Sequence, residues 1–166
     1  MSRTKAIPDA TVFAAVRQML AADGDRAVSF AAVGRVARLA APTLVQRFGS
    51  RDAMVRAALL AAWDDLDATA ARAIAADKGP QGLLKALDAN PPDATLLDMS
   101  LRDAALRPRA AAWRDQIEAS LALRLGGGDK GREGAAILFA AWQGQRLWQV
   151  AGADGFRLKD AVKRLD

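Results

Sequence analysis

The sequence contains no cysteine, no histidine and no tyrosine, and only 5% of its 166 residues are aromatic. Without cysteine the chain forms no disulfide, has no thiol nucleophile and binds no metal through sulfur. Without histidine it lacks the commonest general base and the commonest ligand of transition metals. The remaining residues assemble no nucleophile–base pair, metal-ligand set or phosphate-binding loop. We therefore expect neither an enzyme nor a bound cofactor or metal.

Long apolar segments are also missing, because nowhere do about 18 uncharged apolar residues follow one another. We therefore expect neither a membrane span nor an export signal, and we expect a cytoplasmic location. The hydrophobic content is nevertheless 52%, because alanine is so frequent. Alanine is the strongest helix former, so this composition predicts an all-α fold.

Two short helical patterns lie close together between Phe30 and Phe48, separated by a turn at residues 38–40. The second pattern brings Thr43, Gln46 and Arg47 to an outward polar face. This arrangement is typical of a helix-turn-helix, in which the first helix braces and the second enters the major groove. The expected apolar anchors are Ala31, Ala32, Val36, Ala37, Leu39, Leu44, Val45 and Phe48.

The net charge is concentrated in the same part of the chain. Up to Arg56 there are nine lysines and arginines against four aspartates, whereas residues 57–166 carry 15 basic and 15 acidic residues. Neutralisation of phosphates is the sequence-independent part of DNA affinity, so this asymmetry favours DNA binding; an accidental distribution is the alternative. Arg3 and Lys5 either reach the minor groove or belong to a disordered start.

Helix signals continue beyond this segment. Ser50 and Asp52 start a long helix over 50–78, which Gly79 and Pro80 end. Further helices are expected over 81–90, 93–107, 109–125, 132–150 and 158–165, with a flexible glycine connection at 126–128. The sequence thus predicts a helix-turn-helix domain over 1–52, with the motif at about 29–48, and a second helical domain over 53–166.

Several residues of the first third follow a known pattern: Gly24, Ser29-Phe30, Pro42-Thr43-Leu44, Phe48 and Ser50-Arg51-Asp52. In this respect the chain resembles tetracycline-repressor (TetR) family regulators. The resemblance implies a three-helix DNA-binding head and a helical C-terminal domain that binds an effector and forms a dimer through its last two long helices. The implied function is a ligand-responsive repressor that releases a palindromic operator when a small apolar molecule binds.

The resemblance also implies which residues contact DNA. Thr43 would bind a phosphate or a base edge, and Arg51 stands where the family usually has a phosphate-binding lysine. For Arg47, a salt bridge to Asp52 or another neighbour is the alternative. The full set is Phe30, Ala31, Ala41, Pro42, Thr43, Gln46, Arg47 and Arg51.

Three positions depart from the family pattern. Val45 replaces the usual tyrosine and lacks its phosphate-contacting hydroxyl, and Ala40 stands where a polar residue is common. Arg38 stands where glycine usually makes the turn. These departures keep a second interpretation open, namely a helical interaction protein of the same fold with weak or lost DNA binding.

In the C-terminal half, Trp63, Met99 and Trp113 fall on helices that line the effector pocket of the resembled family, and core packing is the alternative. The helix over 132–150 is apolar nearly all round, as expected of a helix buried on two sides. We expect a homodimer through this helix and the one over 158–165. Its interface residues would be Ile137, Ala141, Gly144 and Trp148.

Charged residues of this half have simpler interpretations. Asp64, Asp65 and Asp67 point in different directions from one helix, so they predict a solvated face rather than a metal site. Asp98 and Arg102 are four residues apart and predict a surface ion pair.

Overall fold

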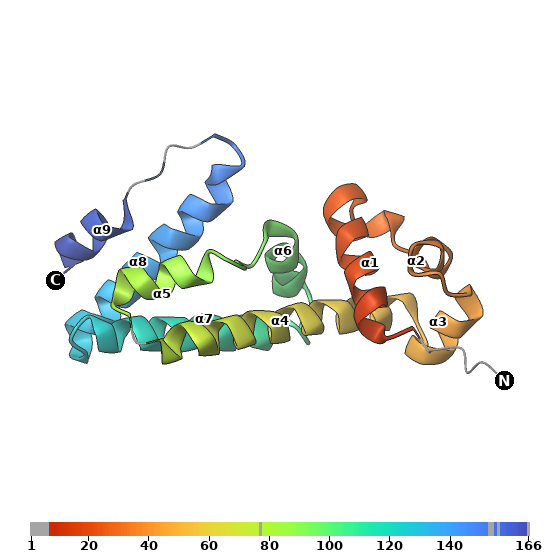
Figure 1. The fold of residues 1–166 in the computed structure, drawn as a ribbon, viewed down its shortest axis with the longest axis horizontal. Coiled ribbons are helices and arrows are strands. Elements are labelled where there is room, and N and C mark those ends of the chain that lie inside the picture. Colours follow the sequence, from red (N-terminus) through yellow and green to blue (C-terminus); the bar gives the residue numbers. More distant parts are fainter. Residues whose placement is uncertain (1–6, 77, 153–154, 156, 166) are drawn as a thin grey trace. The chain divides into compact units, whose positions relative to one another are not determined.

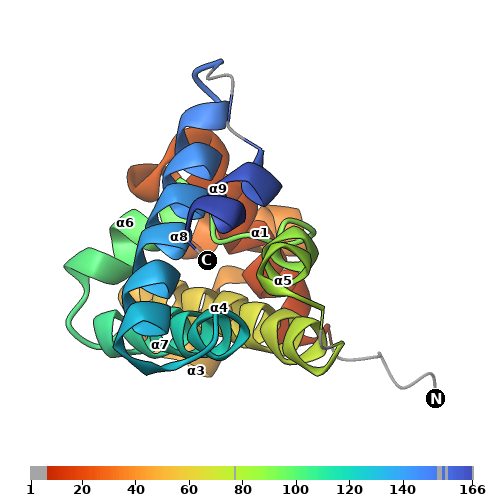
Figure 2. The ribbon, with the colours of Figure 1, turned by 90° about the vertical axis from the view of Figure 1, so that its left-hand side faces the viewer.

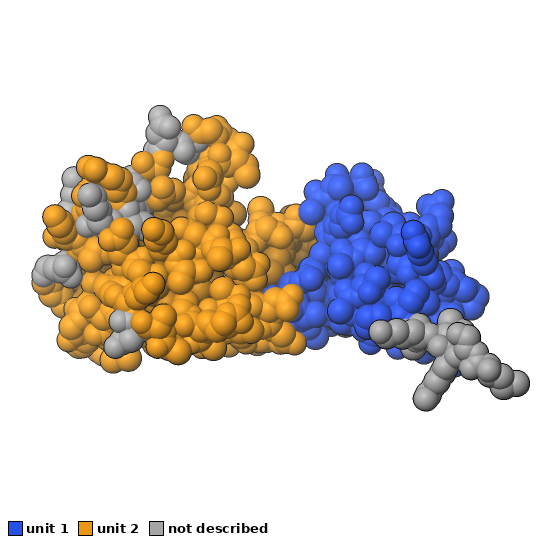
Figure 3. Space-filling view, viewed as in Figure 1, with its two compact units in different colours: residues 1–62 blue, residues 63–166 orange. Residues whose placement is uncertain are grey.

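The computed structural model describes residues 7–76, 78–152, 155 and 157–165. These residues form nine α-helices, one 3₁₀ helix and no strand, which confirms the predicted all-α fold (Figure 1). The chain divides into two compact units, one ending at Ala62 and the other starting at Trp63, within the long helix α4 (Figure 3). Arg3 and Lys5 lie outside the described residues.

The first unit contains α1 (Asp9–Asp23), the 3₁₀ helix η1 (Asp25–Ala27), α2 (Phe30–Ala37), α3 (Ala41–Phe48) and the start of α4 (Arg51–Ala75). Ser29 caps α2 as expected, because its side chain accepts a hydrogen bond from the amide of Ala32 at 3.1 Å. Ser50 likewise accepts from the amide of Ala53 at 3.1 Å in the first turn of α4. The core of this unit includes Val12, Val16, Leu20, Val33, Leu44, Met54 and Leu59.

The second unit contains the rest of α4, then α5 (Pro80–Leu87), α6 (Ala94–Arg102), α7 (Arg107–Arg124), α8 (Gly128–Gln149) and α9 (Leu158–Leu165). The pair α7 and α8 forms the largest helix–helix contact. Large side chains fill the core: Trp63, Leu83, Leu84, Leu87, Leu106, Trp113, Ile117, Leu121, Leu138 and Trp142. None of the helices described in this structure is both long and apolar enough to span a bilayer.

Several expected helix boundaries are wrong: α8 begins at Gly128 instead of 132, α4 ends at Ala75 instead of 78, and α5 ends at Leu87 instead of 90. The helix opened by Asp93 ends at Arg102 instead of 107, and Pro108 lies inside the first turn of α7. Proline is tolerated there because the first turn has no partners for its amides. The glycines at 126–128 are not a loose connection but a tight junction, since the amide of Gly127 donates to the carbonyl of Ala122 at 2.9 Å. All three glycines have positive φ, a conformation that favours glycine.

Helix α7 is fastened to α4 near both of its ends, and the two helices run side by side in Figures 1 and 2. At the start of α7, Arg109 binds the carboxylates of Asp67 and Asp64 on α4. The hydrogen bonds to Asp67 and then Asp64 raise the pKa of the Arg109 guanidinium above its usual value. At its end, Arg124 donates to the carbonyl of Ile74 at 2.9 Å and to that of Lys78 at 3.0 Å.

The aspartates of α4 are partly as expected. Asp64 and Asp65 are exposed, as predicted for a solvated face, whereas Asp67 is half-buried, and both Asp64 and Asp67 bind Arg109 of the neighbouring helix. No group of three or more acidic residues placed to hold a metal ion occurs within the described ranges. The predicted surface pair of Asp98 and Arg102 is confirmed, with a nitrogen–oxygen distance of 2.8 Å.

Candidate nucleic-acid interface and ligand pocket

The helix-turn-helix is closed by a tight contact between α2 and the turn that follows it. The amide of Leu39 donates to the carbonyl of Gly34 at 2.9 Å. A Cβ atom at Gly34 would lie 2.5 Å from the carbonyl oxygen of Leu39, so only glycine fits at this point. Arg38 makes the turn in the left-handed conformation, with φ 56° and ψ 43°, where the resembled family usually has glycine.

The apolar anchors of the motif differ from the expected set. Val36 is 54% exposed and Val45 is 45% exposed, so neither belongs to the core. The buried residues of α2 are Val33, Gly34 and Ala37, and the buried residue of α3 is Leu44. In a helix of eight residues, one apolar side chain shifted by a single position moves about 100° round the axis, so the pattern did not identify the buried face.

The expected base-reading residues lie on the part of α3 away from Leu44. Pro42 and Gln46 are exposed and Thr43 is half-buried. Within the described part of the chain, the side chains of Thr43 and Gln46 form no hydrogen bond. Of the other expected contact residues, Ala31 is exposed, whereas Phe30 and Ala41 are half-buried. The outer face of α3 therefore offers polar groups that have no competing partner among the described residues.

Arg47 is tied to the start of α1. Its Nη1 donates to the carbonyl of Ile7 at 2.8 Å and to the carboxylate of Asp9 at 3.3 Å. The ion pair weighed for Arg47 thus exists, with Asp9 in place of Asp52 as its partner. These contacts fix α3 against α1, so Arg47 has a role within the protein that competes with a contact to DNA.

Arg51 holds the segment before α2 in place. Its Nε donates to the carbonyl of Val28 at 3.1 Å, and its Nη2 donates to both the carbonyl and the carboxylate of Asp25. Its Nη1 binds the carboxylate of Asp52 at 2.9 Å. The hydrogen bond to Asp25, followed by the one to Asp52, raises the pKa of the guanidinium above its usual value. All three guanidinium nitrogens of Arg51 therefore donate hydrogen bonds within the first unit.

Two further arginines lie on the helix-turn-helix, and the set of DNA contacts expected from the sequence includes neither of them. Arg35 and Arg38 are exposed, and no carboxylate of the described residues pairs with them. Arg35 follows Ala31 by four residues on one face of α2, and Arg38 follows in the turn that ends the helix. That spacing was visible in the sequence as a signal for a basic stripe beside the second helix.

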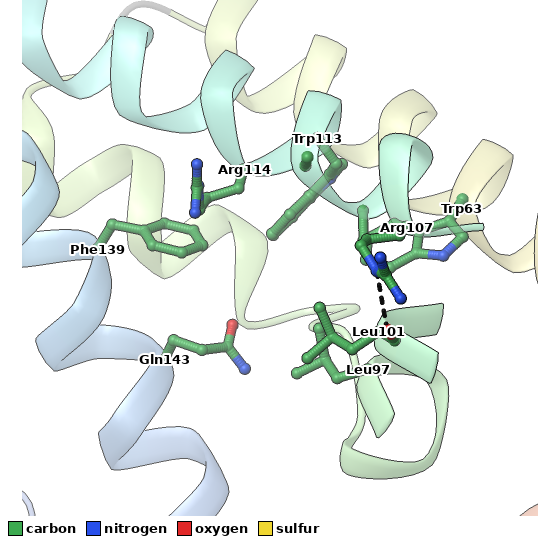
Figure 4. A pocket seen from close by; sticks show the side chains of 10 residues that line it. Trp63, Leu97, Leu101, Arg107, Trp113, Arg114, Phe139 and Gln143 are labelled. Carbon is green, nitrogen blue, oxygen red and sulfur yellow. Dashed lines mark hydrogen bonds between the residues drawn. The ribbon is translucent and has the colours of Figure 1, made fainter. Parts of the chain in front are cut away.

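A pocket of about 270 Å³ lies between α4, α6, α7 and α8 of the second unit (Figure 4). Trp63 and Trp113 line it, as does Phe139, with ring centroids 5.9 Å apart for the two tryptophans and 6.0 Å apart for Trp113 and Phe139. Met99 is not among the lining residues, and Leu97 and Leu101 supply the wall from α6 instead. The pocket is therefore mainly aromatic and aliphatic.

One polar side chain of this pocket escaped the sequence analysis. Gln143 extends from α8 into the space between Phe139 and Leu97 in Figure 4. Its Nε2 and Oε1 are both shielded from solvent and have no hydrogen-bond partner among the described residues. Trp63, by contrast, is satisfied, because its Nε1 donates to the hydroxyl of Ser100 at 3.0 Å.

The stripe expected at the dimer interface is only partly covered in a single chain. Ile137 is 51% exposed and Trp148 is 67% exposed, while Ala141 and Gly144 are half-buried. The opposite side of α8 is buried, so the helix is apolar both inside and outside, as predicted. A Cβ atom at Gly144 would meet nothing within 4 Å. Packing inside one chain therefore gives no reason for glycine at this position.

Two solved structures share this arrangement of helices over nearly the whole chain. A TetR-like transcriptional regulator from Rhodococcus sp. RHA1 matches this chain with a TM-score of 0.70 and 16% identity, over 98% of this chain and 94% of that chain. The multidrug binding protein EbrR, complexed with imidazole, matches with a TM-score of 0.63 and 22% identity, over 95% and 92% of the two chains. No family model and no curated protein matches the sequence. The chain has the TetR-like fold.

Proposed function

We propose that this chain is a dimeric DNA-binding transcriptional regulator, a repressor that releases a palindromic operator when a small molecule binds its second unit. The observation that carries the proposal is the outer face of α3, where the side chains of Thr43 and Gln46 have no hydrogen-bond partner in the part of the chain that the structure describes. A recognition helix needs such unengaged polar groups, because base edges in the major groove are read by hydrogen bonds.

The roles that we propose for residues of the first unit, the DNA-binding head, differ from those that the family resemblance implies. Gln46 reads a base edge, and Thr43 binds a phosphate or a neighbouring base edge. Arg35 and Arg38 contact phosphates, since they are exposed and carry no ion pair with a described residue. Arg51 acts through the segment it holds, which positions α2 beneath the recognition helix.

We place the dimer interface on the exposed side of α8. Ile137, Ala141, Gly144 and Trp148 follow one another at spacings of four, three and four residues, which puts them on one stripe of the helix. Several large apolar side chains of α8 are exposed together, namely Ile137, Leu147 and Trp148, and a contiguous apolar patch of this kind marks a surface that binds a partner. Two heads related by a two-fold axis then favour a palindromic operator with half-sites about one helical turn or slightly more apart.

The dimer is tested by a matched pair of substitutions on α8. Gly144→Arg places a long charged side chain in the middle of the stripe, and Gln149→Arg places the same side chain at an exposed position outside it. We expect the first variant to sediment as a monomer at micromolar concentration and the second to remain a dimer. A wild-type chain that sediments as a monomer at that concentration would remove the dimer from the proposal.

DNA binding is tested by selecting bound sequences from a random pool and measuring the affinity of variants for the selected site. Gln46→Ala is expected to lose about 1–3 kcal/mol and to relax specificity at one base position. Arg35→Ala is expected to weaken binding to all DNA sequences alike. It should also reduce the slope of log affinity against log salt concentration, the salt slope, by about the share of one phosphate contact. Lys85→Ala, an equal change of charge on α5, is the control and is expected to leave both quantities unchanged.

A specific observation supports the alternative of a helical interaction protein. Arg47 and Arg51, two of the expected DNA-binding cations, are both engaged inside the head, and Val45 offers no hydroxyl. If the selection enriches no sequence and the purified dimer binds duplex DNA no better than a neutral protein of its size, this alternative replaces the regulator.

A further inference from the structure

The aromatic pocket of the second unit holds polar atoms that the protein itself leaves unpaired. Both amide atoms of Gln143 and the Nε1 of Trp113 are buried without a hydrogen-bond partner in the described part of the chain. Buried polar groups in native proteins are nearly always hydrogen-bonded, so three such atoms at one pocket need an explanation. The other indoles of the aromatic cluster are satisfied, since Trp63 donates to Ser100 and Trp142 donates to Asp88 at 2.9 Å.

The unpaired atoms have a defined chemical character. An amide presents one acceptor, Oε1, beside one donor, Nε2, in a single plane. The groups that match this edge are those that also carry a donor and an acceptor side by side, such as a lactam or a carboxamide. Packing between Trp113 and Phe139, on the walls of the same pocket, favours a flat ring system next to that edge.

The charges at the pocket exclude one class of ligand. Arg107 and Arg114 line it, and none of its lining residues is acidic. Arg114 pairs with Asp115 at 2.9 Å, whereas Arg107 donates its Nε to the uncharged carbonyl of Leu101 at 3.0 Å and keeps its positive charge without a carboxylate partner among the described residues. An organic cation would meet like charge here without a carboxylate among the lining residues, whereas an uncharged molecule would not.

We propose that the pocket binds an uncharged, planar aromatic molecule whose lactam or carboxamide edge pairs with the amide of Gln143. This assignment names the ligand class of the regulatory site and therefore rests on the proposed function. Gln143 is the specificity-determining residue, and the aromatic walls supply affinity that does not depend on hydrogen bonding. The volume of about 270 Å³ suits a molecule of one or two fused rings.

The test measures binding of three small probes to the purified, DNA-free protein by isothermal titration calorimetry. The probes are 2-quinolone, its N-methyl derivative, which keeps the ring and carbonyl but loses the donor, and the N-methylquinolinium cation. We expect 2-quinolone to bind at least about 10-fold more tightly than the N-methyl compound, which corresponds to one hydrogen bond of about 1.4 kcal/mol. The cation is expected to bind most weakly.

Gln143→Leu keeps the size of the side chain and removes both polar atoms. We expect this variant to bind the two quinolones equally, because neither can then pair with an amide at position 143. The N-methyl compound should lose at most the bond to its carbonyl, and its continued binding shows that the pocket is intact. Gln149→Leu, on the exposed end of the same helix, is the matched control and is expected to keep the wild-type preference.

Three outcomes overturn the inference: no binding of 2-quinolone up to millimolar concentration, tighter binding of the cation, or an unchanged preference in Gln143→Leu. Failure of the proposed function has a different signature, because it is the absence of operator binding in the DNA selection. Since the titrations contain no DNA, the ligand class and the regulatory role are decided independently.

Discussion

Arg51→Ala should lower the stability of the head and leave the salt dependence of DNA binding unchanged. The substitution removes the donors to the carbonyls of Val28 and Asp25 and the ion pairs with Asp25 and Asp52. Loss of the hydrogen bond to the carbonyl of Val28 should cost the most stability, because Val28 is buried, whereas water can replace the lost contacts of the exposed Asp25. An acceptor left unpaired in a partly buried position costs about 1–3 kcal/mol, and we expect about 2 kcal/mol in total.

The size of the effect is large enough to measure by thermal unfolding. For a chain of this length, about 2 kcal/mol corresponds to a fall in Tm of roughly 4–8 °C. Far-ultraviolet circular dichroism follows the helices of both units. Tryptophan fluorescence serves as a second probe confined to the second unit, since Trp63, Trp113, Trp142 and Trp148 all lie after Ala62.

Two variants separate the proposed role of Arg51 from a phosphate contact. Asp52→Ala removes only the ion pair at the most exposed partner, whose side chain is 77% exposed, and is expected to cost under about 1 kcal/mol. Arg35→Ala is the converse case, with unchanged Tm and a lower salt slope. If Arg51→Ala instead keeps the wild-type Tm and lowers the salt slope by about one contact, Arg51 binds phosphate and our assignment is refuted.

Substitutions at Gly34, Arg38 and Trp63 test other contacts of the fold. Gly34→Ala is expected to destabilise the head by about 1–3 kcal/mol in urea unfolding, because the new methyl group would meet the carbonyl of Leu39; an unchanged midpoint would contradict this. Arg38→Gly is expected to raise stability by about 1 kcal/mol while lowering the salt slope of DNA binding, whereas Arg38→Ala should lower the slope without that gain. Trp63→Phe leaves the buried hydroxyl of Ser100 unpaired and should cost about 1–3 kcal/mol, and combining it with Ser100→Ala should recover part of that loss in the same unfolding assay.

The sequence predicted the helical content and the order of the helices because alanine-rich segments and capping residues carry local signals. Asp93 illustrates this, since its side chain accepts from the amide of Leu96 at 2.7 Å just where a helix start was expected. Pro108 shows the limit of such signals. Proline stops one helix and starts another equally well, so its position alone did not reveal that α7 begins before it.

The parts of the candidate sites that escaped prediction depend on contacts between distant residues. Arg47 pairs with Asp9 across 38 positions and Arg51 with Asp25 across 26, and nothing in the local sequence specifies those partners. The pocket could not be predicted for the same reason, because Gln143 lines it only where side chains from four helices come together. Val45 was wrongly predicted to be buried, because it fits the local spacing of apolar residues, whereas in the structure it lies on the exposed side of α3.

The fastening of α7 to α4 has a mechanical consequence for the second unit. Arg109 binds the carboxylates of Asp67 and Asp64 on α4, and Arg124 binds the carbonyl of Ile74 on α4 and that of Lys78 beyond its end. Displacing α7 along α4 by one helical turn, about 5.4 Å, would break all of these contacts at once. The motion that keeps them is a joint rotation of α7 with the part of α4 that belongs to the second unit. If the proposed ligand displaces Trp113, we therefore expect these two helices to rotate together, with no translation of α7 along α4.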